Sequence, residues 1–182
     1  MQKRKIFDNR LLQITLERLC YEVIEEFDEF ENTVILGLQP KGIFLAERIK
    51  QNLNRILQKD ISLGYLDPTF HRDDFRKKDS PLRPNQTFVP FLLEDKKVLL
   101  IDDVLYTGRT VRAALDAMIT FGRPAKVKLL VLINRKYSRD IPIQPDYVGM
   151  EVNCMQHEKV LVELKEQNAE SDNIWIITKE EN

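Results

Sequence analysis

The sequence predicts an α/β protein with a mostly parallel, twisted sheet flanked by helices, and two observations lead to that prediction. Thr33–Leu38 and Val98–Ile101 are short, almost continuous aliphatic runs, which is how strands buried on both faces of a parallel sheet read. Each run leads through a glycine-containing turn into a helical pattern, Ile43–Leu57 after the first and a segment that starts near Val111 after the second. Repeated strand–turn–helix units are typical of α/β folds.

Length and composition fit one domain, which we place at residues 1–182. The 182 residues are 43% hydrophobic and 31% charged, as in ordinary globular proteins. The formal net charge of −1 gives no overall field that would recruit nucleic acid, so an RNA-binding face would have to be a local patch. No apolar run approaches the roughly 20 residues that cross a bilayer. We therefore expect a cytoplasmic protein without a membrane partner.

Cysteine and histidine do not form the spacing of a metal site. Cys20 and Cys154 lie far apart, and they are expected to be free thiols in a reducing compartment. His71 and His157 make no metal cluster either. We therefore expect no metal that is held by thiolate or imidazole ligands.

One further helix is predicted near the start of the sequence. Asp8 or Asn9 can cap a helix that precedes the first strand, because apolar positions then recur at helical spacing. Those positions are Leu12, Leu16, Leu19 and Val23. The helix after the second strand is expected to bury a stripe of its own. The members of that stripe are Val111, Leu115, Met118 and Ile119.

The remaining strands are predicted from short apolar segments bounded by turn residues. In chain order they are Ile61–Tyr65, Asn85–Leu92 as an edge ribbon, Val127–Ile133, and two closing strands of the same domain, Val160–Leu164 and Ile174–Ile177. The segment Asn134–Gln156 lies between the predicted strands Val127–Ile133 and Val160–Leu164. It is polar and rich in proline, and it is expected to be irregular.

The chemistry of the chain is easiest to see after the aliphatic run Val98–Ile101, where Asp102 and Asp103 are followed by the turn Thr107–Thr110. Open α/β sheets bind ligands at the carboxyl ends of their strands. A glycine turn that opens a helix offers backbone N–H groups and the positive end of the helix dipole to a phosphate. The carboxylates can hold ribose hydroxyls or a hydrated Mg²⁺. Together these features suit a sugar phosphate; the alternative is a strand that ends in a solvated aspartate pair before a capped helix.

The segment Asp102–Ala113 closely resembles the PRPP-binding motif of type I phosphoribosyltransferases, in which two acidic residues precede a T-G-x-T phosphate loop. The amino-acid sequence of this segment is similar to that of the PyrR family, whose members are uracil phosphoribosyltransferases that also regulate pyrimidine operons by binding RNA. The resemblance covers nearly the whole chain. It implies the type I phosphoribosyltransferase fold, with a flexible active-site loop at about residues 71–87 and a small hood at about residues 134–157.

The resemblance also implies a reaction, the transfer of phosphoribosyl from PRPP to a nucleobase, which for uracil gives UMP and pyrophosphate. Asp102 and Asp103 would hold the ribose and favour positive charge on it, with Mg²⁺ bound through PRPP near them. The residues that would bind the 5′-phosphate are Thr107, Gly108, Arg109 and Thr110.

Pyrophosphate would bind where the first strand leads into its helix, at Lys41 and Gly42. The family often has arginine at the first of these positions, and lysine keeps the charge but not the bidentate geometry. Arg72 would act as a third catalytic residue beside the aspartates. It lies in Phe70–Asp74, which is similar to the family's aromatic residue followed by R-D-D, and closing of the flexible loop would bring it to the phosphates.

The hood would read the base, and the resemblance assigns Arg135, Lys136 and Tyr137 to that task. The family usually runs D-R-G before R-E-L-P, whereas Asn134–Pro142 lacks the glycine and is one residue longer. Glycine lets a backbone approach a ligand closely. The identity of the base therefore stays open at this point.

Three functions remain open from the sequence: a uracil phosphoribosyltransferase with a pyrimidine-operon role, an RNA-binding attenuation regulator with little catalysis, and a phosphoribosyltransferase for another base. The presumed RNA face keeps the cations of Arg18, Lys136 and Arg139. Other residues stand at positions that are often basic or polar in the family, namely Glu17, Tyr21, Gln144 and Met150. The implied partners are PRPP, a nucleobase and pyrimidine-operon leader RNA, in a homodimer or a larger homo-oligomer.

Overall fold

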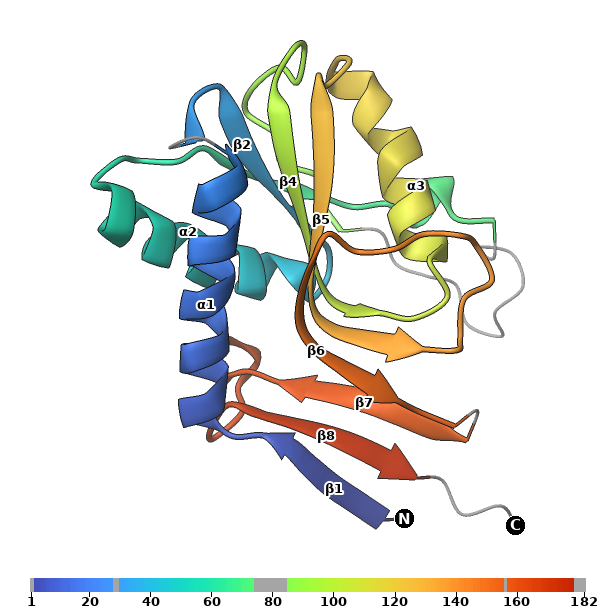
Figure 1. Cartoon of the computed structure of the whole chain (residues 1–182). Coiled ribbons are helices and arrows are strands. Elements are labelled where there is room, and N and C mark those ends of the chain that lie inside the picture. The colour runs from blue at the N-terminus through green and yellow to red at the C-terminus, as the bar shows by residue number, and fades with distance from the viewer. Residues whose placement is uncertain (1, 28–29, 74–84, 156, 179–182) are drawn as a thin grey trace.

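A five-stranded parallel sheet forms the centre of the molecule (Figure 1). The computed structural model describes residues 2–27, 30–73, 85–155 and 157–178. The strand order is β3-β2-β4-β5-β6. The strands are β2 (Thr33–Leu38), β3 (Leu63–Leu66), β4 (Lys97–Leu105), β5 (Lys126–Lys136) and β6 (Tyr147–Asn153). Because β2 and β4 are neighbours, the two turns predicted to bind phosphate groups lie at one edge of the sheet.

Helices cover both faces of this sheet. They are α1 (Asn9–Phe27), α2 (Gly42–Leu57) and α3 (Arg109–Met118). Figure 1 shows α1 and α2 together on one side and α3 on the other. Alternate residues of the strands supply two cores: Ile35 and Leu99 pack in the core under α1 and α2, and Leu36 and Leu100 pack in the core under α3. This arrangement confirms the predicted parallel sheet flanked by helices.

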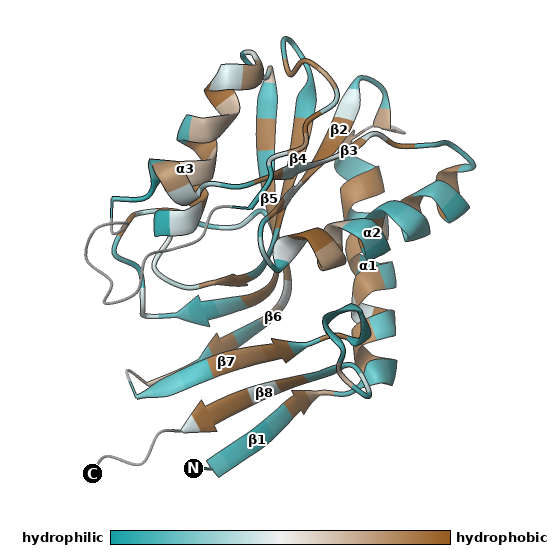
Figure 2. Ribbon diagram, turned by 180° about the vertical axis from the view of Figure 1, so that it is seen from behind, coloured by the Kyte–Doolittle hydropathy of each residue, from teal (hydrophilic) through white to brown (hydrophobic). Residues whose placement is uncertain are grey.

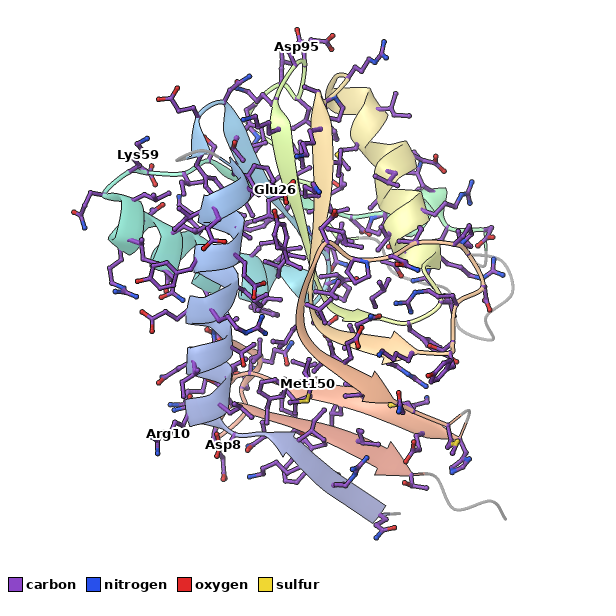
Figure 3. All side chains as sticks on the ribbon, viewed as in Figure 1. Asp8, Arg10, Glu26, Lys59, Asp95 and Met150 are labelled. Carbon is purple, nitrogen blue, oxygen red and sulfur yellow. The ribbon has the colours of Figure 1, made fainter. Side chains whose placement is uncertain are left out.

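The first helix forms as predicted. Asp8 caps it, because its Oδ1 accepts a hydrogen bond from the Leu11 N–H at 2.8 Å. Asp8 is labelled at the start of α1 in Figure 3. All four positions of the predicted apolar stripe are buried, namely Leu12, Leu16, Leu19 and Val23.

The predicted stripe of α3 is wrong at two of its four positions. Leu115 is 39% exposed and Ile119, which lies beyond the end of the helix, is 70% exposed. The buried face is instead made of Val111 and Met118 together with three alanines. Small side chains let a helix lie close to a sheet, so the contact face follows Ala113, Ala114 and Ala117 and not the largest apolar residues.

A second, antiparallel sheet of order β1-β8-β7 lies below the first in Figure 1. Its strands are β1 (Gln2–Phe7), β7 (Glu158–Glu163) and β8 (Asn173–Thr178). The two closing strands are therefore confirmed, but they belong to this separate sheet. Sequence reasoning missed β1, whose first four residues are exposed and drawn hydrophilic in Figure 2. Met150 of β6, labelled in Figure 3, lines a hollow between the two sheets with Ile6 and Ile176.

Two further expectations need correction. The segment Asn134–Gln156 is not irregular throughout, because β5 extends to Lys136 and β6 pairs with it in parallel. The edge ribbon at residues 85–92 is reduced to one antiparallel bridge between Phe88 and Tyr65. Most of the flexible loop predicted at residues 71–87 lies outside the described residues, at 74–84. None of the described helices is both long and apolar enough to span a membrane.

Candidate functional site

A cavity of about 260 Å³ opens where β2, β3 and β4 end. Its wall is formed by residues from four segments that are far apart in the sequence. They are Gln39, Pro40 and Lys41 after β2, Pro68, Thr69, Arg72 and Asn85 after β3, Asp102, Asp103 and Val104 of β4, and Thr110 of α3. The fold thus brings both aspartates, Lys41, Arg72 and one threonine of the predicted phosphate turn to a single cavity.

The aspartate pair lies inside the last part of β4, which extends to Leu105. Asp102 is only 8% exposed and Asp103 is half-buried. Backbone N–H groups hold both side chains, since Asp102 Oδ1 accepts from the Asp103 N–H at 2.9 Å and Asp103 Oδ1 accepts from the Val104 N–H at 2.8 Å. The two side chains also share a hydrogen bond, and their carboxylates line the cavity, where a ligand with hydroxyl groups or positive charge can meet them.

Burial has a consequence for the charge of this pair. It raises the pKa of Asp102, and the adjacent negative charge of Asp103 raises that pKa further, while Arg72 acts in the opposite direction. Burial also raises the pKa of Asp103, which Lys41 lowers. Two carboxylates that are costly to ionise together favour a ligand that brings positive charge or hydrogen-bond donors between them.

Gly42, the first residue of α2, is packed directly against this pair. A Cβ atom at this position would lie 2.6 Å from the Ile101 carbonyl oxygen and 3.1 Å from Asp102 Oδ1. Only glycine lets the helix begin so close to the carboxylate. Lys41 precedes the helix and no side chain caps the first turn. The helix N-terminus and the lysine ammonium therefore both lie beside the cavity, where an anion can meet them.

The predicted phosphate turn has the backbone of an anion site. Gly108 has φ +89°, in the left-handed region that favours glycine, and it is the residue before α3. No side chain caps α3 either. Thr107 Oγ1 lies 3.4 Å from the Arg109 N–H. Thr107 Oγ1 thus accepts from the first N–H group of α3, and the next N–H groups of the first turn are available to a phosphate.

The side chains of Arg72 and Arg109 have different positions relative to the cavity. Arg72 Nη1 donates to Thr110 Oγ1 at 3.1 Å, so this arginine reaches from the loop to the start of α3. The Arg109 guanidinium instead pairs with Asp73 at 2.5 Å and with Asp140 at 2.9 Å. The carboxylates that hold the Arg109 guanidinium do not line the cavity of the aspartate pair, and neither does Arg109.

The three hood residues lie around a separate cavity of about 270 Å³. Arg135 is only 5% exposed, and its guanidinium lies 4.0 Å from the centre of the Tyr106 ring. Lys136 pairs with Glu151, and Tyr137 is 91% exposed. The structure does not bring these three residues into the cavity of the aspartates.

Tyr106 is a residue that sequence reasoning missed. It lies directly between β4 and the phosphate turn, and its ring is 44% exposed. The Nε of Arg135, packed over that ring, is buried and has no hydrogen-bond partner among the described residues. The signal was present in the sequence, because an aromatic residue interrupts the polar turn that follows Asp103.

A parallel sheet with two helix N-termini and an aspartate pair at the ends of its strands is an arrangement that fits a ligand carrying both a sugar and phosphate groups. The sequence pattern of the phosphoribosyl transferase domain matches residues 3–167. The chain is also 38% identical over 176 residues to the bifunctional protein PyrR of Enterococcus faecalis, covering 97% of both chains. It is 39% identical over 167 residues to the bifunctional protein PyrR of Bacillus subtilis, covering 91% of this chain and 92% of that one.

The chain belongs to the phosphoribosyltransferase domain family and, within it, to the PyrR proteins. The hypoxanthine phosphoribosyltransferase of Trypanosoma cruzi has the same fold, with a TM-score of 0.73, 15% sequence identity and 97% coverage of both chains. The fold and the family predicted from the sequence are thereby confirmed.

Proposed function

We propose that this protein transfers the 5-phosphoribosyl group of PRPP to uracil and releases pyrophosphate. The observation that carries the proposal is the convergence of Asp102, Asp103, Lys41 and Arg72 on one cavity at the end of β4. The cavity offers carboxylates at its floor and cations on its walls, which is the charge pattern of a pentose that carries a pyrophosphate.

The aspartates would bind the ribose hydroxyls. As the bond to pyrophosphate breaks, positive charge develops on the ribose ring, and carboxylates fixed by backbone hydrogen bonds stabilise that charge without having to reorganise. The turn Thr107–Thr110 would hold the 5′-phosphate through backbone N–H groups at the start of α3. Both contacts position the sugar, and no covalent intermediate with the protein is needed.

The leaving group would lie between Lys41 and Arg72. Both cations line the cavity with the aspartate pair, and the N-terminus of α2 adds the positive end of its dipole. Mg²⁺ bound to PRPP would neutralise pyrophosphate further, and the charge of the aspartates fits a hydrated Mg²⁺ nearby. Negative charge that develops on pyrophosphate is thus met by fixed positive charge.

The base would approach from the side of Tyr106 and Arg135. Tyr106 directly follows β4, between the aspartates and the phosphate turn. The guanidinium of the buried Arg135 lies 4.0 Å from the centre of the Tyr106 ring. The exposed Tyr106 would offer a planar surface to a base, and the buried Arg135 guanidinium packs on its ring. The choice of uracil rests on the PyrR relatives.

A second function, binding of pyrimidine-operon leader RNA, is favoured by the relatives' description as bifunctional. The cations that we expected on the RNA face are engaged within the chain. Arg18 pairs with Glu22 at 2.5 Å, and Lys136 pairs with Glu151. RNA would have to displace these contacts, and we expect its affinity to fall with salt according to the number of phosphates that these cations then neutralise.

The proposed reaction is tested with a panel of free bases, PRPP and Mg²⁺, with released pyrophosphate as the measurement. We expect uracil to be used and UMP to form, with hypoxanthine and guanine giving no product. Release with a purine alone would contradict the choice of base, and release with none of the bases would contradict the activity. A gel shift with pyrimidine-operon leader RNA at several salt concentrations tests the second function separately.

A further inference from the structure

The carbonyl groups of the phosphate turn are held by one short segment of the hood. Arg139 Nη1 donates to the carbonyl oxygens of Leu105, at 3.3 Å, and of Tyr106. The next carbonyl, that of Thr107, accepts from the N–H groups of Asp140, at 3.0 Å, and Ile141, at 3.1 Å. Three consecutive carbonyl groups, which join β4 to the turn, therefore point to residues 139–141.

This orientation fixes the direction of the N–H groups as well. In a planar trans peptide the N–H points away from the preceding C=O. The N–H groups of Tyr106, Thr107 and Gly108 are therefore turned away from the hood segment. Consecutive backbone N–H groups on one side of a turn form a concave anion site, and the open N-terminus of α3 continues it.

Arg139 is itself fixed from other directions. Its Nε donates to the Ile143 carbonyl oxygen at 3.0 Å, and its Nη1 also donates to the Arg135 carbonyl oxygen at 3.1 Å. Its Nη2 donates to the side-chain oxygen of Asn134. A guanidinium with all three nitrogens engaged is a rigid fork, and it places the turn relative to the end of β5.

We propose that Arg139 is a positioning residue for the 5′-phosphate: it does not touch the ligand, but it holds the Leu105 and Tyr106 carbonyl groups so that the N–H groups of Tyr106 and Thr107 point to the phosphate. This inference rests on the proposed function. It also separates the two anion sites of the cavity. Pyrophosphate would bind at Lys41 and Arg72, which line the cavity of the aspartate pair, whereas Arg139 hydrogen-bonds to the turn and to the end of β5.

The test compares two ligands, ribose 5-phosphate and inorganic pyrophosphate with Mg²⁺, by calorimetric titration of the full chain. Arg139→Ala is expected to raise the Kd of ribose 5-phosphate at least about tenfold, because two charge-assisted hydrogen bonds to the carbonyl groups of Leu105 and Tyr106 are lost. The Kd of pyrophosphate is expected to stay unchanged. Arg139→Lys keeps the charge without the fork and is expected to lie between the two.

Arg112→Ala is the matched control, since it removes a guanidinium from α3 that pairs only with the exposed Asp116 at 3.0 Å among the described residues. Unchanged binding of both ligands in Arg139→Ala would overturn the inference, and so would an equal loss of both. If the unmodified protein binds neither ligand, the proposed function itself fails. If Arg139→Ala does not fold, the ratio of the two Kd values in Arg139→Lys decides: a ratio equal to that of the unmodified protein overturns the inference.

Discussion

The carboxylate of Asp67 accepts a hydrogen bond from the backbone N–H of Asn85, 18 residues further along the chain. Its other oxygen accepts from the N–H of Thr69 at 2.8 Å and from the Thr69 hydroxyl at 2.5 Å. Asp67 is 8% exposed, and both of its partners line the cavity of the aspartate pair. One buried carboxylate thus holds both flanks of the segment that carries Arg72.

Asp67→Ala is expected to weaken PRPP binding and to lower stability. The substitution leaves three donors without their acceptor, and each hydrogen bond to a charged group contributes about 2 kcal/mol. We expect the KM for PRPP to rise more than kcat falls, because Thr69 and Asn85 lose their common anchor while Asp102 and Asp103 keep theirs. Steady-state kinetics and urea unfolding measure the two effects. Asp116→Ala, at an exposed position of α3, is the control.

Asp103→Asn is expected to lower kcat by about a hundredfold, as loss of one fixed electrostatic contact to a transition state does. The fold should survive. Burial raises the pKa of Asp103, so its charge opposes folding at neutral pH, and an uncharged amide removes that cost. The free energy of unfolding at pH 7 is therefore expected to be equal or higher. A variant with full turnover would contradict the role given to the pair.

Gly42→Ala separates helix propensity from the packing against Asp102. In an open helix position this change stabilises by about 1 kcal/mol. Here the new Cβ would lie 2.6 Å from a backbone carbonyl oxygen, so we expect stability and turnover both to fall. Thermal unfolding and pyrophosphate release measure them. Gln51→Ala, on the exposed side of the same helix, should leave both unchanged. A more stable Gly42→Ala would show that α2 can move away.

A pH dependence of stability is expected from Arg48 of α2, which pairs with Asp172 at 2.7 Å and with Glu166 at 2.6 Å. Arg48 lowers the pKa of both carboxylates from their ordinary values of 3.8 and 4.5. The stabilisation is complete above these values and is lost as the pH falls through the lower pKa values of the folded protein.

The variant that tests this dependence is Asp172→Asn. We expect it to be less stable than the unmodified protein at pH 7, by about 2 kcal/mol, and to lose less stability on acidification. Urea unfolding at several pH values gives both numbers. Asp60→Asn is the control, because Asp60 is 85% exposed and pairs with Lys50 on the surface. Parallel stability curves for Asp172→Asn and the unmodified protein would contradict the assignment.

The sequence predicts the centre of the molecule better than its periphery. β2 has the predicted bounds, whereas β4 continues past the predicted strand end at Ile101 to include both aspartates, and α3 begins inside the predicted phosphate turn, at Arg109. These elements are buried on both faces or carry a glycine that the backbone requires, so local residues determine them. The cavity unites residues from four segments, and only the family resemblance linked Lys41 and Arg72 to the aspartates before the fold was known.

The misses have tertiary causes. β1 is a strand because it pairs with β8, and its exposed residues carry no periodic signal. β6 pairs with β5 inside a segment that was expected to be irregular, and Gly149 lets its backbone approach Leu132. Leu115 and Ile119 were assigned to the core as part of a helical apolar stripe, whereas alanines make the contact. The hood residues were placed by resemblance alone, and their direction depends on Glu151 and Tyr106, to which the resemblance gave no role.

Helix α2 contacts the reaction cavity at Gly42 and the outer sheet's loop at Arg48, six residues and roughly 9 Å apart along one rigid rod. A shift of the antiparallel sheet β1-β8-β7 would therefore move α2 and, with it, the residue that packs against Asp102 in the cavity. Thermodynamic reciprocity then requires that whatever settles on that sheet and shifts α2 changes the hold on the pentose, and that an occupied cavity changes the sheet's affinity in equal measure.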